Sequence, residues 1–481
     1  MTAFLISLVV LVVGYFIYGT FVDRVLATDS SREMPCNTMR DDIDYRPMAP
    51  WRVFLIQFLN IAGLGPIFGA IMGIMFGPAA FLWIAMGTIF AGGVHDFCSG
   101  VISVRMGGRS LPEIVGKQLG KGVMNFTRVF SVLLLMLVAA VFVVTPAGLL
   151  AAMTPDNLNV TFWIVAIFIY YMLATLLPID KLIGSLYPLF GFALLFMAAG
   201  IMAVLFFGDV TIPVSFGSGF ESHNAQGLPV FPMMFVSIAC GAISGFHATQ
   251  SPMMARCLTN EKLARPIFYG AMVAEGIVAL IWAAAAVAFT GGYEQLGEYL
   301  STPGHTAGTL VHDVSFSWLG AFGGFLAVLG VIAAPITTGD TALRSARLSL
   351  ADMLGFEQAS LWKRLAVAVP VFVLTAAIMM MDFNVLWRYF AWCNQTLAMV
   401  TLWAVTVYLS RKTKFYVISF VPAFFMTVVA VSYLLSAPMP EGFGLDQPVA
   451  VFAGSVTAVI VTGLFFFLKK KPANAFELNY D

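Results

Sequence analysis

The chain has 481 residues, of which 60% are apolar and only 10% are charged. A soluble domain carries about 25% charged residues, so this composition excludes a protein whose whole surface faces water. The formal net charge is zero, which gives no support to nucleic acid binding. The mean hydropathy of +0.90 instead predicts a chain whose surface is largely covered by a lipid bilayer.

Apolar runs recur along the whole chain. Runs of about 20 residues are long enough to cross about 30 Å of hydrocarbon as helices, and lipid favours helices because they bond their own backbone groups. The first run, residues 2–21, is too long for the core of a signal peptide and has no basic segment before it, so we expect it to be retained. We predict about thirteen spans, at residues 2–21, 52–76, 79–104, 123–150, 159–178, 186–207, 230–254, 264–290, 314–335, 362–380, 383–409, 415–435 and 448–468.

The basic residues predict the orientation of these spans. Of the 25 lysines and arginines, all except Arg388 fall in connections on one side of the predicted bundle. The long connections on the other side contain none; they are residues 151–158, 208–229, 291–312 and 436–447. The positive-inside rule therefore predicts an N-terminus outside, a cytoplasmic C-terminus and an odd number of spans.

Two of the predicted spans carry glycine and proline at membrane depth. One contains the run Asn60–Pro66 (NIAGLGP), and the other contains the run Cys240–Pro252 (CGAISGFHATQSP). Glycine costs about 1 kcal/mol and proline about 3 kcal/mol inside a helix, so each run predicts a break in its helix. Unwound backbone at this depth is tolerated only where protein or a water-filled cavity satisfies it.

The two breaks occupy matching places in the chain. The number of residues from Gly63 to Gly241 equals the number from residue 52 to residue 230, where the two spans start. Because an odd number of spans separates the two copies, the second copy has the opposite orientation in the membrane. We therefore predict an all-α integral membrane protein with a LeuT-type core of two inverted five-helix repeats. The predicted parts are an extra span and cytoplasmic loop at 1–51, the repeats at 52–209 and 210–410, and two C-terminal spans with a tail at 411–481.

Helix packing is a simpler explanation for part of the first break. Gly65, Gly69, Gly73 and Gly77 recur every four residues, and stripes of small residues let helices approach closely. This explanation does not account for the serine, histidine, threonine and glutamine that crowd the second break.

Ionisable residues inside the spans are functional candidates, because hydrocarbon penalises them unless they are solvated or paired. His247 lies in the second break and suits proton coupling near neutral pH, although it could also cap free carbonyls. His95 and Asp96 point about 100° apart on their helix and suit either a proton relay or pairing with a neighbouring helix. Glu275 suits a proton carrier or a buried hydrogen bond. We predict proton coupling through these four residues.

Arg388 lies inside a span and apart from the other basic residues. A guanidinium binds a carboxylate through two parallel hydrogen bonds, which suits an organic acid or a peptide C-terminus, but the side chain could also extend to the interface. The residues that we predict to bind substrate lie at the breaks or beside them. They are Asn60, Gly63, Gly65, Gly241, Ser244, Gly245, His247, Gln250, Arg388 and Asn394.

Signatures of soluble enzymes are absent from the sequence. It contains no G-x-x-x-x-G-K-[ST], H-E-x-x-H or G-x-S-x-G motif. The five cysteines show no C-x-x-C spacing, which excludes a zinc knuckle and a disulfide framework of the usual kind. We predict no enzyme activity, no cofactor and no resident metal ion.

Several motifs resemble signatures of the carbon starvation protein A (CstA) family, and the chain looks like a short form of it. These are NIAGLGPIFGA at 60–70, GVHDF at 93–97, ISGFHATQSP at 243–252, APITTGDT at 334–341 and WRYFAW at 387–392. The resemblance runs from about residue 14 to residue 412. It implies a bacterial inner-membrane transporter linked to carbon scavenging, with peptide uptake or proton-driven pyruvate uptake as its activity.

The expected function is secondary active import of short peptides or pyruvate, with a proton or sodium ion as the coupling partner. The candidate cation site is the cluster Thr337, Thr338, Asp340 and Thr341, since the corresponding helix of LeuT-type proteins supplies hydroxyls to sodium. These hydroxyls could instead bond backward to their own helix. The alternatives are a sodium-coupled symporter and a passive channel or facilitator for carboxylates.

Overall fold

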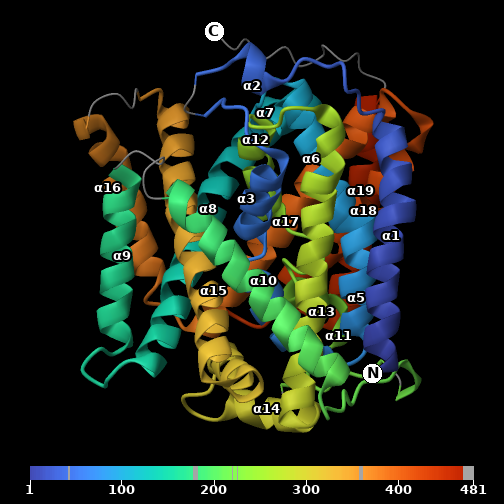
Figure 1. Cartoon of the computed structure of the whole chain (residues 1–481). Helices are drawn as coiled ribbons and strands as arrows, with labels where there is room; N and C mark the ends of the chain where they lie inside the picture. Colours follow the sequence, from blue (N-terminus) through green and yellow to red (C-terminus); the bar gives the residue numbers. More distant parts are fainter. Residues whose placement is uncertain (42–43, 177–182, 219, 225, 357–360, 470–481) are drawn as a thin grey trace.

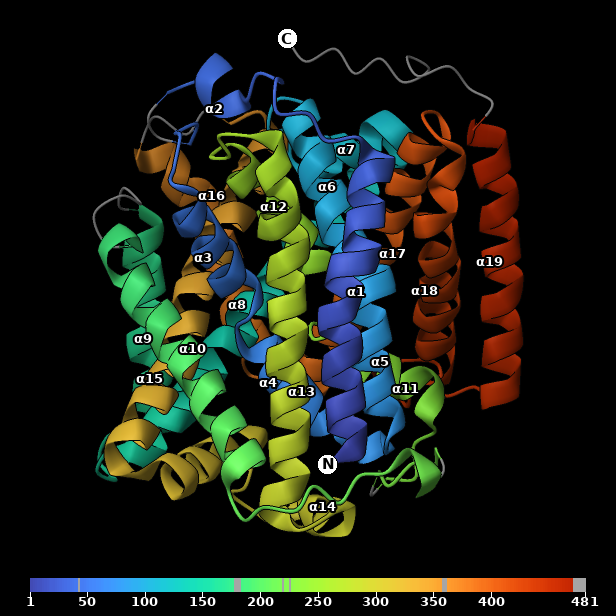
Figure 2. The same ribbon diagram turned by 45° about the vertical axis from the view of Figure 1, so that its right-hand side comes forward.

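The computed structural model describes residues 1–41, 44–176, 183–218, 220–224, 226–356 and 361–469. Over these residues the chain is built from helices and contains no β-strand. Helix α1 begins at one face of the molecule and helix α19 ends at the opposite face (Figures 1 and 2). We call these the N-terminal face, at the bottom of both views, and the C-terminal face, at the top.

The helices follow one another with short connections. From the N-terminus they are α1 (Thr2–Leu26), α2 (Pro35–Thr38), α3 (Pro50–Ile61), α4 (Leu64–Gly73), α5 (Ala79–Gly87), α6 (Gly93–Arg105), α7 (Leu111–Leu119), α8 (Lys121–Met153), α9 (Val160–Leu176) and α10 (Ile183–Phe207). They continue with α11 (Val230–Ser237), α12 (Gly245–Ala255), α13 (Gly270–Thr290), α14 (Tyr293–Ser301), α15 (Ala307–Leu354), α16 (Leu361–Ile378), α17 (Phe383–Ser410), α18 (Val417–Ser436) and α19 (Gln447–Lys469). Two π-helical turns, η2 (Thr88–Gly92) and η6 (Arg265–Tyr269), precede α6 and α13 directly.

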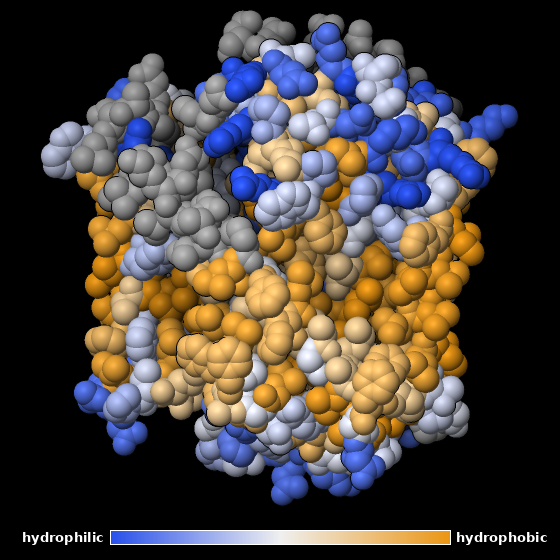
Figure 3. All heavy atoms as spheres, in the orientation of Figure 1, coloured by the Kyte–Doolittle hydropathy of each residue, from blue (hydrophilic) through white to orange (hydrophobic). Residues whose placement is uncertain are grey.

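The long helices are apolar enough to cross a membrane. Among the described residues, nine helical stretches meet this condition by length and composition, and the bent pair α3–α4 makes a tenth. On the face drawn in Figure 3, apolar side chains form a band across the middle of the molecule, and hydrophilic side chains gather at both ends. The prediction of an all-helical, multi-pass membrane protein is confirmed.

The first predicted break is present between α3 and α4. Helix α3 ends at Ile61, α4 starts at Leu64, and the two helices meet at an angle of 44°. Pro66 lies in the first turn of α4, where a backbone N–H has no partner within the helix. The missing N–H of proline therefore costs nothing at this place.

The second break is shorter than the sequence predicted. Residues 238–244 are unwound, but α12 starts at Gly245, so the prediction that Gly245–Pro252 belong to the break was wrong. Helix α12 starts early because Asn394 of α17 accepts a hydrogen bond from the Phe246 backbone N–H at 2.7 Å. This side-chain cap comes from a distant part of the chain.

Helix α15 also differs from its predicted range, residues 314–335. It runs from Ala307 to Leu354, with a left-handed residue, Gly320 (φ 68°), at a kink. Pro335 does not end it, and the hydroxyl of Tyr171 on α9 donates to the Pro335 carbonyl at 3.1 Å. The threonine cluster 337–341 therefore lies well inside a helix and not at its end.

The glycine stripe of α4 packs against the second broken segment. A Cβ atom on Gly65 would lie 2.3 Å from Cys240 Cβ, and one on Gly73 would lie 2.1 Å from Ile238 Cγ1. A Cβ atom on Gly69 would lie 2.9 Å from the Ser237 carbonyl oxygen. The packing explanation of the stripe therefore holds for these three glycines. Their close packing places the two breaks of the chain next to each other.

Candidate functional site

The π-helical turn η2 brings α6 against the second break. A π turn leaves backbone groups open to partners outside its own helix and is frequent at functional sites. Here the Tyr269 hydroxyl donates to the Ile89 carbonyl at 2.7 Å. Thr88 Oγ1 donates to the carbonyl of Gly241 in the unwound segment at 3.1 Å. Helix α6 follows η2 directly and carries His95 and Asp96.

Asp96 is the shared partner of two histidines. His95 Nδ1 lies 2.7 Å from Asp96 Oδ1, and His247 Nδ1 on α12 lies 2.9 Å from Asp96 Oδ2. An ionised carboxylate can only accept hydrogen bonds, so both imidazoles donate from Nδ1 when Asp96 is ionised. In each neutral ring Nε2 is then left as an acceptor. The structure thus brings together three residues that the sequence singled out.

Glu275 of α13 extends this group by one more residue. Its Oε2 atom lies 3.4 Å from His247 Nε2, and neither of its oxygens has a hydrogen-bond partner among the described residues. The four side chains are completely buried. We call His95, Asp96, His247 and Glu275 the buried row: four titratable groups, on three helices, that are enclosed by protein.

Asn394 of α17 holds the second break in shape. Its Oδ1 atom accepts from Ser244 Oγ at 3.0 Å and from the Phe246 N–H, and its Nδ2 atom donates to Cys240 Sγ at 3.2 Å. A Cβ atom on Gly245 would lie 2.5 Å from the Asn394 carbonyl oxygen, so only glycine permits this approach. Asn394 therefore positions the break, and its binding of substrate stays a prediction.

The other residues predicted to bind substrate lie close to the two breaks. Asn60 is buried near the end of α3, and Gly63 is one of the two residues between α3 and α4. A Cβ atom on Gly241 would lie 2.7 Å from Ala279 Cβ, so this glycine lets α13 approach. Gln250 on α12 donates from Nε2 to Thr249 Oγ1 at 3.0 Å, and its Oε1 atom has no partner among the described residues.

Arg388 lies apart from the buried row, near the N-terminal end of α17. Its Nε atom donates to Glu441 Oε1 at 2.8 Å, and its Nη2 atom donates to the same oxygen. Glu441 lies in the connection between α18 and α19 and is almost fully buried. The two residues line a cavity of about 290 Å³ at the N-terminal face. The sequence predicted neither this partner nor this cavity.

The threonine cluster of α15 uses its hydroxyls within the helix. Thr337 Oγ1 and Thr338 Oγ1 donate to the Ala334 carbonyl at 2.8 and 2.9 Å, and Thr341 Oγ1 donates to the Thr337 carbonyl at 2.9 Å. Asp340 Oδ1 lies 3.8 Å from Arg344 Nη2. This is the backward bonding that was the alternative to a cation site.

Sequence reasoning missed two polar residues at the breaks. Thr88 gave no signal, because a single threonine in a span is common. Gln57 is fully buried on α3, one turn before Asn60, and neither its Nε2 nor its Oε1 has a partner among the described residues. A glutamine inside an apolar run was a usable signal, since polar side chains are costly there.

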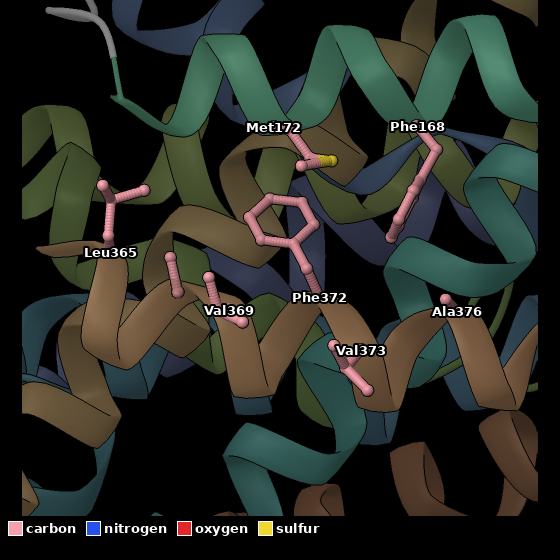
Figure 4. Close-up of a pocket in the computed structure, with 8 residues that line it drawn as sticks. Phe168, Met172, Leu365, Val369, Phe372, Val373 and Ala376 are labelled. Carbon is pink, nitrogen blue, oxygen red and sulfur yellow. The ribbon is translucent and has the colours of Figure 1, made fainter.

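A second cavity, of about 200 Å³, has an entirely apolar lining. It lies between α9, which carries Phe168 and Met172, and α16, which carries Leu365, Ala368, Val369, Phe372, Val373 and Ala376 (Figure 4). It offers no polar group to orient a charged solute. In the part of the chain that the structure describes, no group of three or more His, Cys, Asp or Glu side chains could hold a metal ion.

Solved transporter structures share this fold at low sequence identity. The structure of MhsT in complex with L-phenylalanine matches with a TM-score of 0.54 and 14% identity over 87% of this chain and 98% of that one. A manganese transporter of Eremococcus coleocola matches with a TM-score of 0.53 and 12% identity over 90% of this chain and 99% of that one. At such identity the likeness concerns the fold alone.

Relatives with similar sequences are membrane transporters where they are characterised. An uncharacterised membrane protein of Haemophilus influenzae is 40% identical over 350 residues, which cover 62% of this chain and 94% of that protein. The peptide transporter CstA of Campylobacter jejuni is 29% identical over 334 residues, or 56% of this chain and 47% of that one. The pyruvate/proton symporter BtsT of Escherichia coli is 25% identical over 345 residues, or 57% of this chain and 47% of that one.

The matches to the Campylobacter jejuni and Escherichia coli transporters cover about half of the length of those two proteins. They and the structural neighbours are transporters and not enzymes, as the sequence predicted. The family model described as carbon starvation protein CstA matches residues 1–158, 151–322 and 301–433. Since these matches span most of the sequence, the chain belongs to the CstA family.

Proposed function

We propose that this protein is a secondary active transporter that imports short peptides or pyruvate across the bacterial inner membrane, driven by protons, in the response to carbon starvation. The names of its relatives, a peptide transporter and a pyruvate/proton symporter, support the two solute classes. The observation that carries proton coupling is the buried row, where four titratable groups lie in contact and away from solvent. Ionisable groups in such a place are costly and therefore mark function.

In this proposal the proton moves between Glu275 and His247. Asp96 fixes the His247 ring through Nδ1, so that Nε2 faces Glu275 Oε2 at 3.4 Å. A partner at one ring nitrogen sets the tautomer and leaves the other nitrogen to take or give a proton. The three residues lie on α6, α12 and α13, so relative movement of these helices changes the distance that the proton must cross.

We also propose the architecture in which this relay operates. It has thirteen spans, two inverted five-helix repeats of the LeuT type at 52–209 and 210–410, an N-terminus outside and a cytoplasmic C-terminus. A broken helix in each half, α3–α4 and α11–α12, supports the repeat. The likeness in fold to MhsT and the segregation of basic residues to one side support the rest.

The proposed solute site lies between the two breaks. Its residues are Asn60, Gly63, Gly65, Gly241, Ser244, Gly245, His247, Gln250 and Asn394, with Arg388 nearer the N-terminal face. Unwound backbone supplies free N–H and C=O groups that can bind a polar solute. The unpartnered side-chain atoms of Gln57 and Gln250 support a polar site at this depth.

Transport into liposomes tests the proposal. Purified protein should accumulate pyruvate or a dipeptide when an inward proton gradient is imposed, and an inward sodium gradient alone should not drive accumulation. Glu275→Gln should lower proton-driven accumulation about tenfold or more, because the amide does not transfer protons at neutral pH. Glu294→Gln, on the exposed surface of α14, is the matched control and should behave as wild type.

Sodium-driven accumulation that survives Glu275→Gln would instead support the threonine cluster of α15 as the coupling site. Downhill flux with no accumulation under either gradient would support a passive facilitator. The hydroxyls of Thr337, Thr338 and Thr341 already donate within α15, which is why we favour protons.

A further inference from the structure

The cavity at the N-terminal face is bounded by parts of the chain that are distant in sequence. Its volume of about 290 Å³ is lined by residues of α11, α17, α18, the connection before α11 and the connection after α18. We call it the N-face cavity. Its polar lining residues are Gln226, Ser237, Arg388, Tyr433 and Glu441.

In the N-face cavity the guanidinium of Arg388 is already paired with a carboxylate, that of Glu441. Both Nε and Nη2 of Arg388 donate to one oxygen of Glu441, Oε1. The Glu441 side chain is 2% exposed, whereas that of Arg388 is 30% exposed. The arginine therefore keeps part of its surface open to the cavity, while its internal partner is shielded. Two parallel bonds to two carboxylate oxygens, the stronger arrangement, are not made in this pair.

The segment that carries Glu441 is folded back tightly on the end of α18. The Phe443 N–H donates to the Leu434 carbonyl at 3.0 Å, and the Gly444 N–H donates to the Ala437 carbonyl at 2.9 Å. From α17, the Tyr389 hydroxyl donates to the Pro440 carbonyl at 2.7 Å. The connection is thus a short strap that holds the carboxylate over Arg388.

A second donor in the cavity has no partner. Tyr433 lines the cavity, and its buried hydroxyl makes no hydrogen bond to any described residue. A buried hydroxyl without a partner is costly, so its presence calls for a ligand or a water molecule. Arg388 and Tyr433 together offer a cation and a neutral donor, the combination that a small carboxylate requires.

The cavity reaches the residue that precedes the second break. Ser237, which lines it, is the last residue of α11 before the unwound segment. Arg388 precedes Asn394 by six residues on α17, which is about 9 Å along a helix axis. A carboxylate bound at Arg388 would therefore lie about two helical turns from the residue that holds the second break.

We propose that the N-face cavity is an entry site for the carboxylate group of the transported solute, and that Glu441 is an internal competitor that holds Arg388 until the solute replaces it. Arg388 and the Tyr433 hydroxyl bind the solute carboxylate. The solute class is accordingly an organic anion with a free carboxylate, such as a keto acid or a peptide with an unblocked C-terminus. This inference rests on the proposed transport function.

Equilibrium binding tests the site without transport. Purified protein in detergent is titrated with pyruvate and with a dipeptide, and the midpoint of thermal unfolding reports occupancy. Glu441→Gln should bind at least one of them about threefold or more tightly than wild type. A competitor that masks a site lowers its apparent affinity in proportion to the fraction of molecules in which the site is masked. Arg388→Gln should weaken binding about tenfold or more, as expected for loss of a charged hydrogen-bond donor.

Matched controls complete the binding experiment. A dipeptide with an amidated C-terminus should show no difference between wild type and Glu441→Gln, and Glu294→Gln should bind as wild type. The double variant Arg388→Gln/Glu441→Gln should bind as weakly as Arg388→Gln. If the pair is only a structural tie, both single variants lower the unfolding midpoint without ligand and leave affinity unchanged; that result, or absence of carboxylate binding to wild type and Glu441→Gln, overturns the inference.

Liposome uptake separates this inference from the function on which it rests. If Arg388→Gln accumulates solute under a proton gradient with an unchanged half-saturation concentration, the entry site is disproved and the proposed transport function stands. If Glu441→Gln binds carboxylates more tightly but neither gradient drives accumulation, the transport proposal is disproved and the binding site stands.

Discussion

Asp96 is the residue on which the buried row depends. It accepts one hydrogen bond on each carboxylate oxygen, from His95 and from His247. If α12 moves away from α6, the bond to His247 breaks while His95 can still satisfy the carboxylate. A buried charge that lost its only partner would be strongly destabilising, so the second histidine permits movement that a simple pair would oppose.

Asp96→Asn tests this arrangement. The amide keeps the size of the side chain but offers one acceptor and one donor, so one of the two histidines must change its tautomer. We expect a folded protein in which proton-driven uptake into liposomes falls about tenfold or more. Ser99→Ala is the control, since Ser99 bonds only the backbone carbonyl of Asp96 and its removal should leave uptake near the wild-type rate.

At the scale of elements, the second break is shaped by α17. Helix α12 begins where Asn394 caps it, and Gly245 allows the two helices to touch at the backbone. Besides the bond from the Ile243 N–H to the Ala239 carbonyl within it, the unwound segment is bonded by side chains of other elements, Thr88 at its centre and Asn394 at its end. The conformation of the break is therefore stabilised by side chains of other helices and does not follow from low helix propensity alone.

Gly245→Ala should disturb this junction. The new methyl group would lie 2.5 Å from the Ala398 backbone nitrogen, and backbone atoms yield less readily than side-chain ends. We expect a loss of about 1–3 kcal/mol in stability, as for other overpacked sites, and reduced uptake. The midpoint of thermal unfolding measures the first effect. Gly148→Ala, where a Cβ atom meets nothing within 4 Å in α8, should leave both quantities unchanged or raise the midpoint.

The elements differ in how far the sequence could predict them. Apolar length located the long helices, and glycine with proline located both breaks, because these properties are local. The start of α12 could not be found locally, since it depends on Asn394, about 150 residues away. The pairing of Arg388 with Glu441 was likewise out of reach, because a charged residue in a surface connection carries no sign of its partner. For α15 the predicted range stopped at residue 335, but the helix continues through Pro335 to Leu354, because proline is tolerated inside membrane helices.

For the whole molecule, the charge pattern predicts which face meets the cytoplasm. The five cysteines are all buried, so a cysteine introduced at an exposed position supplies the main reactive thiol. Asp156→Cys, between α8 and α9, should react with a membrane-impermeant maleimide in intact cells. Lys262→Cys, between α12 and α13, should react only after the membrane is permeabilised. The opposite pattern would reverse the proposed orientation.

The glycine stripe of α4 has a mechanical consequence. At Gly69 the α4 main chain meets the Ser237 carbonyl, and at Gly65 and Gly73 the side chains of Cys240 and Ile238 fill the space that a Cβ atom would take, so the two interrupted helices are in close contact. Close-packed surfaces transmit displacement, so we expect neither helix to tilt while the other stays still. In the proposed transporter, widening a passage toward one compartment should then narrow it toward the other, which would prevent a leak during each transport cycle.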